Sequence, residues 1–480
     1  MLFRQIFEPK LAQYAYLIGC QPTKEAILID PQRDIDRYVA MAKAEGVRII
    51  ATAETHIHAD FLSGVREFAE QHGTHCYLSD AGTADWKSNW AKEDAYDVTF
   101  LCNGDTFRIG NIGFTVTHNP GHTPEHISFL VTDHGGGADD PMGLVSGDFV
   151  FVGALGRPDL LETAAGHIGA QSPSAERLYH SVIDFLDLPD HVQVWPGHGA
   201  GSACGKSLGA VPQSTVGYER RFNPSIDVAR QGAEPFIDAI LDGQPEPPMY
   251  FARMKQQNRD GVPLLGELPM PKRLSAGDLA ALPEDTILLD TRRDRSAALA
   301  QHIPGSLYTP FNKQFNTLVG CYVTDAKTPL VLLLDEADVD EAVRDLVRIG
   351  YDHIVGYVPL AELDAYLNQH ETACIEEIDF ADVEARRQQP GMTVVDVRRR
   401  DEYESGHIPG ALNAAHTRLA EHLDRLPRGG TLLVHCLSGG RSAYAAAYLA
   451  QQGFSVVYVN DHFSNYRTAY GVAKTDLAPA

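Results

Sequence analysis

Residues 47–61 read Val-Arg-Ile-Ile-Ala-Thr-Ala-Glu-Thr-His-Ile-His-Ala-Asp-Phe, and this stretch decides the fold of the first half of the chain. Its apolar, β-branched beginning (47–52) predicts a buried strand. The strand leads directly into two histidines and a carboxylate with the spacing His56-x-His58-x-Asp60. If the chain turns sharply as it leaves the strand, these groups can converge on one metal ion. Neutral imidazole together with carboxylate suits zinc or iron.

Later strands deliver further polar residues in the same way. Predicted strands over 114–118, 143–146 and 192–195 run into His122, Asp148 and His198. Layered α/β folds usually place their sites at the carboxyl ends of strands. A single histidine is more often a hydrogen-bonded core or surface residue, but repeated placement at strand ends favours a metal site. The other predicted elements of this region are strands over 14–18 and 26–30 and a helix over 33–45.

These residues resemble the metal-binding motifs of the metallo-β-lactamase superfamily, whose members usually carry His-x-His-x-Asp-His. Phe61 stands where the last histidine of that motif would be. Because that histidine helps to hold a second metal ion, its replacement argues against a two-zinc hydrolytic site. The resemblance narrows to the persulfide dioxygenases, which hold one Fe(II) by two histidines and one aspartate. By position it implies His56, His122 and Asp148 as ligands, a triad that leaves coordination positions open for substrate and dioxygen.

Other residues near this site are interpreted through the same resemblance. His58, Asp60 and His198 would orient ligands or substrate from a second layer, or one of them would itself bind the metal. Cys204 lies in a loop of small residues after His198. It would hold or relay a persulfide, or it is a bystander thiol.

The segment Gly156-Arg157-Pro158-Asp159-Leu160 also matches the persulfide dioxygenases. Two functional roles for Arg157 are compatible with that match: it would bind a carboxylate of the thiol carrier, or it would brace Asp148. The alternative is a structural ion pair between Arg157 and Asp159.

The second half of the chain contains an internal repeat. Residues 287–292, Ile-Leu-Leu-Asp-Thr-Arg, are echoed by 394–398, Val-Val-Asp-Val-Arg. Residues 301–306, Gln-His-Ile-Pro-Gly-Ser, are echoed by 406–411, Gly-His-Ile-Pro-Gly-Ala. Proline-rich residues between about 242 and 273 read as a linker before the repeat. Two consecutive α/β units of roughly 100 residues each are therefore predicted.

The second repeat carries a reactive-looking loop, Cys436-Leu437-Ser438-Gly439-Gly440-Arg441-Ser442. It lies between a predicted strand (432–435) and a predicted helix (443–451), so backbone N–H groups and the helix dipole would stabilise a thiolate or persulfide anion at the cysteine. Arg441 would add positive charge for an incoming sulfur oxyanion. The alternative is a buried structural cysteine. The loop resembles that of the rhodanese sulfurtransferases, in which the cysteine carries a persulfide sulfur.

The first repeat departs from that pattern at the decisive place. Alignment of the two repeats puts Asp335 where the cysteine should be and Asp340 where the arginine should be. This unit is interpreted as catalytically inactive, serving as a spacer, an interface or a docking surface. The expected fold is α/β: a metallo-β-lactamase αββα sandwich followed by two rhodanese-like domains with parallel sheets. The expected boundaries are 1–245 for the sandwich, 246–272 for the linker, 273–370 for the cysteine-less domain and 375–480 for the domain with Cys436.

The resemblance as a whole is to persulfide dioxygenase–rhodanese fusions. It implies oxidation of a low-molecular-weight persulfide, such as glutathione persulfide, by dioxygen at one Fe(II) to give sulfite. It also implies sulfur transfer through Cys436 that makes or uses thiosulfate, in the context of sulfide detoxification. One rival hypothesis is a zinc thioesterase of the glyoxalase II kind with rhodanese appendages. Another is a non-enzymatic sulfur carrier with a structural metal, although structural zinc sites are closed.

The composition limits the partners and the cellular location expected for this chain. Lys and Arg number 40 against 64 Asp and Glu among 480 residues, a net charge of −24, which disfavours nucleic acids and anionic membranes as partners. Seven scattered cysteines do not make a disulfide framework. No apolar stretch approaches the roughly 20 residues of a membrane span, and the N-terminal residues do not read as a secretion signal. We expect a cytoplasmic enzyme, and a homo-oligomer is compatible with the sequence.

Overall fold

The computed structural model describes residues 1–163, 166, 169–206 and 208–474. The chain divides into two compact units. The first comprises residues 1–267 with 347–350, and the second comprises 268–346 with 351–480.

The first unit contains two six-stranded sheets. One has the order β1 (Leu2–Glu8), β2 (Gln13–Cys20), β3 (Glu25–Ile29), β4 (Arg48–Ala53), β5 (His75–Ser79), β6 (Val98–Leu101). The other has the order β14 (Ser214–Thr215), β13 (Gln193–Pro196), β10 (Gly143–Gly147), β9 (Ile127–Asp133), β8 (Ile112–His118), β7 (Thr106–Ile109). A short hairpin joins β11 (Val150–Phe151) to β12 (Ala154–Leu155). The strands predicted before the histidines and Asp148 are thereby confirmed as β4, β8, β10 and β13.

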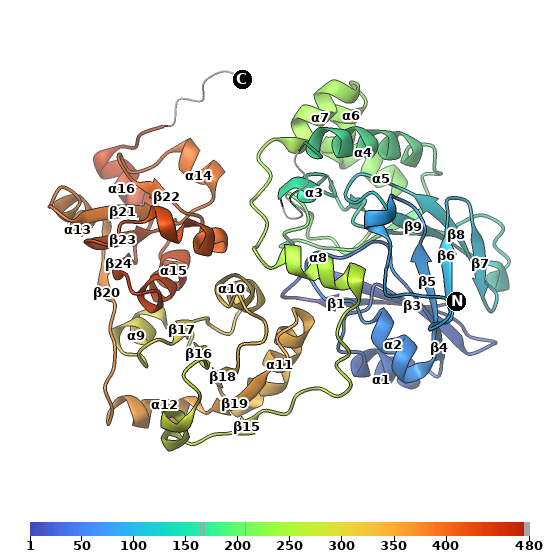
Figure 1. The fold of residues 1–480 in the computed structure, drawn as a ribbon. Helices are drawn as coiled ribbons and strands as arrows, with labels where there is room; N and C mark the ends of the chain where they lie inside the picture. Colours follow the sequence, from blue (N-terminus) through green and yellow to red (C-terminus); the bar gives the residue numbers. More distant parts are fainter. Residues whose placement is uncertain (164–165, 167–168, 207, 475–480) are drawn as a thin grey trace. The chain divides into compact units, whose positions relative to one another are not determined.

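Helices cover the outer faces of these sheets (Figure 1). On the first sheet, Tyr38 of α1 (Asp36–Ala44) and Phe68 of α2 (Val65–His72) pack against Leu17 and Leu28. On the second, α4 (Gln171–Phe185), α6 (Pro224–Ala229) and α7 (Ala233–Leu241) pack against Leu144 and Val194. The shorter α3 (Leu160–Thr163) and α5 (Val216–Phe222) also belong to this unit. Apolar side chains of both sheets meet between them, which confirms the αββα sandwich.

Helix α8 (Phe251–Asp260) lies within the segment expected to be a linker. Its buried residues, Phe251, Met254, Lys255 and Asn258, recur at the spacing of one helical face. The proline-rich residues on either side concealed this face in the sequence. Residues up to 267 therefore belong structurally to the first unit.

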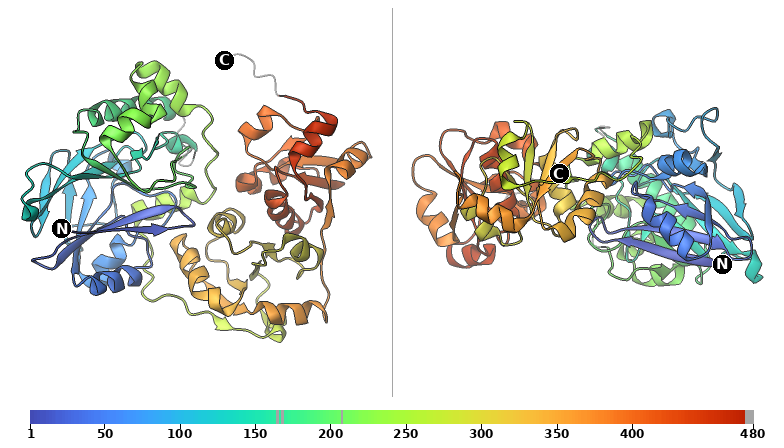
Figure 2. Two further views of the ribbon diagram at one scale, coloured as in Figure 1. Left: turned by 180° about the vertical axis from the view of Figure 1, so that it is seen from behind. Right: turned by 90° about the horizontal axis from the view of Figure 1, so that it is seen from below.

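The second unit contains two five-stranded parallel sheets. The first has the order β15 (Lys272–Arg273), β19 (Ile354–Val358), β18 (Leu330–Leu333), β16 (Ile287–Asp290), β17 (Leu307–Tyr308). The second has the order β20 (Glu376–Ile378), β24 (Ser455–Val459), β23 (Thr431–His435), β21 (Met392–Asp396), β22 (Leu412–Asn413). The two orders are equivalent strand by strand, so the internal repeat is confirmed as a structural duplication. Both views of Figure 2 draw this unit in yellow-green to red.

Helices flank both sheets of the second unit. The first repeat has α9 (Arg295–Ala300), α10 (Phe315–Tyr322), α11 (Val339–Arg348) and α12 (Leu360–Leu367). The second has α13 (Phe380–Arg386), α14 (Arg400–Ser405), α15 (Gly440–Gln451) and α16 (Phe463–Tyr470). The small side chains Ala443, Ala446 and Ala447 of α15 let Leu299 and Tyr308 of the other repeat pack closely against it. None of the described helices is both long and apolar enough to cross a bilayer.

Candidate metal centre and sulfur-transfer loop

Three of the predicted ligands converge in the first unit. One ligand atom from each of His56, His122 and Asp148 lies within 4.8 Å of the others. The Nε2 atoms of His56 and His122 are 3.9 and 3.5 Å from Asp148 Oδ2. All three side chains are buried, and they follow β4, β8 and β10. The strand ends thus bring together residues that are up to 92 positions apart in the sequence.

The other ring nitrogen of each histidine is held from behind. His56 Nδ1 is 2.9 Å from Thr55 Oγ1, and His122 Nδ1 is 3.0 Å from the carbonyl oxygen of Arg157. Such contacts fix the ring orientation and leave Nε2 directed at the centre, which is the usual arrangement around metal-binding histidines.

Asp148 has the properties expected of an anionic metal ligand. Neither of its carboxylate oxygens has a hydrogen-bond partner among the described residues. Burial raises the pKa of Asp148 to about 6. A buried carboxylate that accepts no hydrogen bond is costly unless a cation compensates it, so this donor set fits a metal ion. Gly156 approaches so closely that a Cβ there would lie 1.8 Å from the Asp148 carbonyl oxygen.

A second group adjoins the first. One ligand atom each of Asp60, His198 and Cys204 lies within 4.8 Å of the others. His198 Nε2 is 3.5 Å from Asp60 Oδ2 and equally 3.5 Å from Asp148 Oδ2. Burial, and then the charges of Asp60 and Asp148, raise the pKa of the Cys204 thiol well above its usual range. Cys204 is therefore beside the centre, but it is not activated as a thiolate by the protein groups around it.

Among the described residues, His58 belongs to neither of these two groups of possible metal ligands. Its Nε2 is 3.2 Å from Asp30 Oδ1. Burial lowers the pKa of His58, but the charge and hydrogen bond of Asp30 outweigh it and raise that pKa to about 9. The same carboxylate accepts hydrogen bonds from the backbone N–H and the hydroxyl of Thr55, at 2.7 and 2.9 Å. Asp30 thus holds the turn that carries His56, a role that sequence reasoning missed.

Phe61 occupies the position of the superfamily's usual histidine. It is fully buried, and its ring centroid lies 4.3 Å from that of His58. An apolar ring provides no ligand atom at this point.

The guanidinium of Arg157 is committed to protein partners. Its Nε and Nη2 donate to the two carboxylate oxygens of Asp159 at 2.7 and 2.6 Å, and Nη1 donates to the Ala203 carbonyl at 3.2 Å. This geometry favours the ion-pair alternative over a role in binding the carrier or bracing Asp148. Arg157 acts through its backbone, whose carbonyl contacts His122.

Helix α8 supplies two residues that the sequence did not reveal. Asn258 Nδ2 donates to the carbonyls of His58 and Phe61 at 2.8 and 2.7 Å, and its Oδ1 accepts from the Ser63 N–H at 2.9 Å. One turn earlier, the buried ammonium of Lys255 lies 3.9 Å from the Trp86 ring centroid and has no hydrogen-bond partner among the described residues. Burial lowers the pKa of Lys255 to about 8. The nearby buried carboxyl of Glu125 opposes this fall in pKa, so Lys255 has an acidic partner close to His122.

The candidate sulfur-transfer loop, residues 436–442, lies between β23 and α15, as predicted. Cys436 is buried, and its Sγ accepts a hydrogen bond from the Gly439 N–H at 3.2 Å. Ser442 Oγ is 3.5 Å from Sγ and also donates to backbone carbonyls, so the serine fixes the loop. Leu437 is half exposed at the loop surface. Gly440 begins α15.

The guanidinium of Arg441 has an acidic partner. It forms a two-pronged ion pair with Glu402 of α14, at 2.5 and 2.8 Å. Burial works against the charge of Arg441, but the contact with Glu402 raises its pKa. The cation is therefore held in place next to the cysteine loop. Glu402 had no motif that marked it in the sequence.

The first repeat has no equivalent of this loop. After β18, the chain continues through Asp335 into a short 3-10 helix (Glu336–Asp338). Upstream, the Arg292–Asp290 ion pair at 2.6 Å repeats the Arg398–Asp396 pair at 2.6 Å. The framework of the repeat is thus retained while the nucleophile and its arginine are absent.

Comparison with known proteins agrees with both parts of this description. Residues 9–198 match the model of the metallo-beta-lactamase superfamily, and residues 379–469 match that of the rhodanese-like domain. The mitochondrial persulfide dioxygenase ETHE1 of Bos taurus is 30% identical over 251 residues, which cover 51% of this chain and 84% of the bovine protein. The chain belongs to the metallo-β-lactamase superfamily.

Other members of the superfamily extend the comparison. A crystal structure of a metallo-beta-lactamase from Staphylococcus aureus subsp. aureus COL is 39% identical, with a TM-score of 0.66, and covers 75% of this chain and 99% of that one. A probable polyketide biosynthesis zinc-dependent hydrolase, BaeB of Bacillus velezensis, is 25% identical and covers 43% of this chain and 82% of the hydrolase. This chain therefore joins a metallo-β-lactamase domain to a rhodanese-like domain.

Proposed function

We propose that the chain oxidises a low-molecular-weight persulfide at the first centre and transfers sulfur at Cys436. The overall oxidation is R–S–SH + O2 + H2O → R–SH + SO3²⁻ + 2 H⁺, in which the outer sulfur is oxidised and dioxygen is reduced. The buried two-histidine, one-aspartate group carries this proposal. The identity to the bovine persulfide dioxygenase supports it.

In this proposal His56, His122 and Asp148 hold one Fe(II). Iron bound there would supply open coordination positions and the redox chemistry that dioxygen requires. Thr55 and the Arg157 carbonyl keep the two imidazoles oriented.

Cys436 carries the second reaction. Its persulfide sulfur is attacked by sulfite, so that Cys436–S–S⁻ + SO3²⁻ gives Cys436–S⁻ + S2O3²⁻, and the reverse reaction consumes thiosulfate. The leaving thiolate is stabilised by the Gly439 N–H that already contacts Sγ. Arg441, fixed by Glu402, provides positive charge for the sulfur oxyanion.

The rival function is hydrolysis by two zinc ions. The Asp60, His198 and Cys204 group offers a second set of ligand atoms, and the zinc-dependent hydrolase relative is compatible with it. Phe61 argues against this rival, because the usual additional histidine is absent. The two functions differ in metal identity and number.

The deciding experiment measures metal content and oxygen consumption of the full chain, purified without added metal. With glutathione persulfide we expect close to one Fe per chain and rapid oxygen uptake. Asp148→Ala should lose both, while thiosulfate:cyanide sulfur transfer continues. Asp227→Ala, at an exposed ion pair with Arg230, serves as the matched control and should behave as wild type. Two tightly bound zinc ions per chain, with no oxygen uptake, would refute the proposal in favour of hydrolysis.

A further inference from the structure

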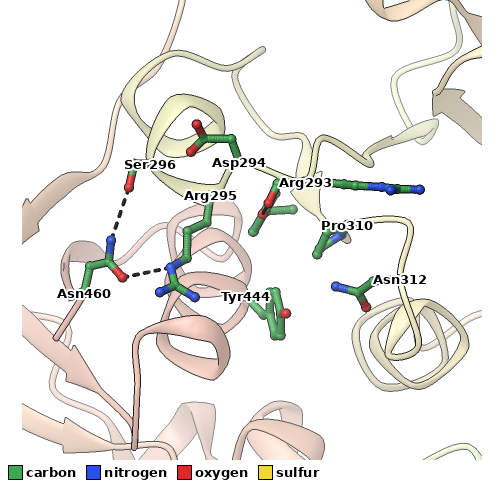
Figure 3. Close-up of a pocket in the computed structure, with 9 residues that line it drawn as sticks. Arg293, Asp294, Arg295, Ser296, Pro310, Asn312, Tyr444 and Asn460 are labelled. Carbon is green, nitrogen blue, oxygen red and sulfur yellow. Dashed lines mark hydrogen bonds between the residues drawn. The ribbon is translucent and has the colours of Figure 1, made fainter. Parts of the chain in front are cut away.

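The two rhodanese repeats share a pocket of about 400 Å³ (Figure 3). It is mainly polar and combines residues of the cysteine-less repeat with two residues of the active one. The lining residues are Arg293, Asp294, Arg295, Ser296, Tyr308, Pro310, Asn312, Tyr444 and Asn460. The inactive repeat thus contributes most of a concave surface beside the loop that carries Cys436.

Arg295 connects this pocket to the sulfur-transfer loop. Its Nε donates to Asn460 Oδ1 at 2.8 Å, and its Nη2 donates to the Ser438 carbonyl at 3.1 Å. Asn460 in turn donates to Ser296 Oγ at 3.2 Å (Figure 3). Gly439 is left-handed at φ 91, and a Cβ there would lie 2.3 Å from Asn460 Oδ1. The pocket wall and the loop are therefore in direct contact.

Several donors of the pocket remain available. Among the described residues, Arg295 Nη1 and the Tyr444 hydroxyl have no hydrogen-bond partner. The Arg293 guanidinium has neither an ion pair nor a hydrogen bond among those residues, and it extends away from Arg295 and Asn460 (Figure 3) towards a second pocket that Arg293 also lines. The Asp294 carboxylate is engaged with the Ala297 N–H at 3.1 Å. Arg295 and Tyr444 thus keep donors that suit an anion, although the carboxylate of Asp294 lies in the same wall.

The two repeats differ at the position of Arg295. Arg293 and Arg295 are equivalent in sequence to Arg399 and Asp401 of the active repeat. There, Arg399 pairs with Asp401 at 2.8 Å. Asp294 stands where the active repeat has Arg400, so the two stretches carry the same net charge. They differ in placement, because Arg295 occupies the position of the aspartate that pairs with Arg399. The cysteine-less repeat thus places an arginine, where the other repeat has an aspartate, against its neighbour's loop.

We propose that this pocket binds the carboxylate of an anionic low-molecular-weight thiol that exchanges sulfur with Cys436, with Arg295 as the positioning residue. The proposal rests on the proposed sulfur transfer at Cys436. The exchange is Cys436–S–S⁻ + R–S⁻ + H⁺ → Cys436–S⁻ + R–S–SH, and it runs in either direction. Carboxylate recognition keeps the carrier's sulfur next to the loop, whereas thiosulfate or cyanide needs no such anchor.

The test compares acceptor thiols that differ only in charge, with thiosulfate as sulfur donor and the full chain as enzyme. The pairs are 3-mercaptopropionate with 2-mercaptoethanol, and glutathione with its diethyl ester. In wild type, kcat/KM should favour the carboxylate member of each pair. Loss of one exposed charge contact corresponds to about a fivefold change. Arg293→Met should therefore reduce this preference about fivefold, and Tyr444→Phe should reduce it by a smaller factor.

Variants of Arg295 distinguish a role in carboxylate recognition from a merely structural role. Arg295→Met should reduce the carboxylate preference and also lower kcat for every acceptor, because the Ser438 contact is lost. Arg295→Lys should restore the preference more fully than kcat, since it keeps the charge but not the forked geometry. Arg386→Met, which removes an exposed arginine paired with Glu376, is the control.

Two results would overturn the proposal. One is a wild-type enzyme that shows no carboxylate preference, and the other is a preference that survives both Arg293→Met and Arg295→Met. Titration calorimetry with unreactive S-methylglutathione distinguishes failure of the pocket from failure of Cys436 chemistry. Binding that depends on Arg293 without any thiosulfate:cyanide turnover would refute sulfur transfer while leaving a carboxylate site. Turnover without such binding would refute the pocket alone.

Discussion

The contact between α8 and the His56–Asp60 turn predicts a large effect from a residue outside every motif. Asn258→Ala removes three buried hydrogen bonds and leaves the carbonyls of His58 and Phe61 and the N–H of Ser63 without partners. At about 1–1.5 kcal/mol for each such bond, the first unit should lose roughly 3–5 kcal/mol of unfolding free energy. The turn that positions His56 should loosen, so retention of the proposed metal ion should fall as well.

Intrinsic fluorescence can measure this loss in the full chain. All three tryptophans, Trp86, Trp90 and Trp195, lie in the first unit, so their emission reports that unit and not the second. Urea titrations of metal-free protein would give the change in free energy, and the slope would show whether the unit still unfolds as before. Asn89→Ala is the matched control, since Asn89 is exposed and makes one side-chain hydrogen bond to Asp260.

We expect the free energy of unfolding of the first unit to fall by several kcal/mol in Asn258→Ala and by about 0.5 kcal/mol or less in Asn89→Ala. If Asn258→Ala shifts the midpoint no more than the control, α8 does not hold the ligand turn and the reasoning fails. Unchanged iron content in a destabilised variant would instead show that the turn keeps its geometry without this helix.

Three further changes test the second unit. Cys436→Ser should leave oxygen uptake intact while the product from glutathione persulfide moves from thiosulfate to sulfite; unchanged thiosulfate formation, measured by thiol-trapping chromatography against a no-enzyme blank, would exclude Cys436. Asp335→Ala should leave thiosulfate:cyanide turnover unchanged, because a carboxylate cannot carry sulfane sulfur, and a tenfold loss in a folded variant would contradict this. Burial, and then the charge of Arg441, lower the pKa of His416 to about 3. Its unfolded pKa is higher, near 6.5, so the second unit should lose stability as pH falls from about 6.5 towards 3, by at most about 1.4 kcal/mol per pH unit. Hydrogen exchange of second-unit peptides should show this slope, and His416→Phe should flatten it; equal slopes would disprove the assignment.

Local patterns were sufficient to predict the architecture. The strands before His56, His122 and Asp148 are short apolar runs that end at polar turns. This pattern can be recognised from the local sequence alone. The repeat was visible for the same reason, since each copy preserves its own strand and its Asp–Arg pair. Ligand atoms within 4.8 Å follow once these strand ends lie at one edge of the sandwich.

The supporting residues were not predictable from the sequence. Asp30, Asn258 and Glu402 act through hydrogen bonds to residues that are distant in the chain, and such contacts leave no periodic pattern. Asn258 was hidden further by the proline-rich flanks of α8. Arg157 shows the opposite difficulty: its motif was clear, but only the geometry distinguishes an ion pair with Asp159 from contact with substrate.

The close approach of Gly156 to Asp148 also affects how a map of mutational tolerance should be interpreted. Any side chain at position 156 would collide with the Asp148 backbone, at 1.8 Å from Cβ to the carbonyl oxygen. In saturation mutagenesis Gly156 should therefore be as intolerant as Asp148, although glycine contributes no atom to the chemistry. Gly439, pressed against Asn460, should behave in the same way beside Cys436. Substitutions at these glycines should thus reduce function as strongly as substitutions of the reactive residues in both sites.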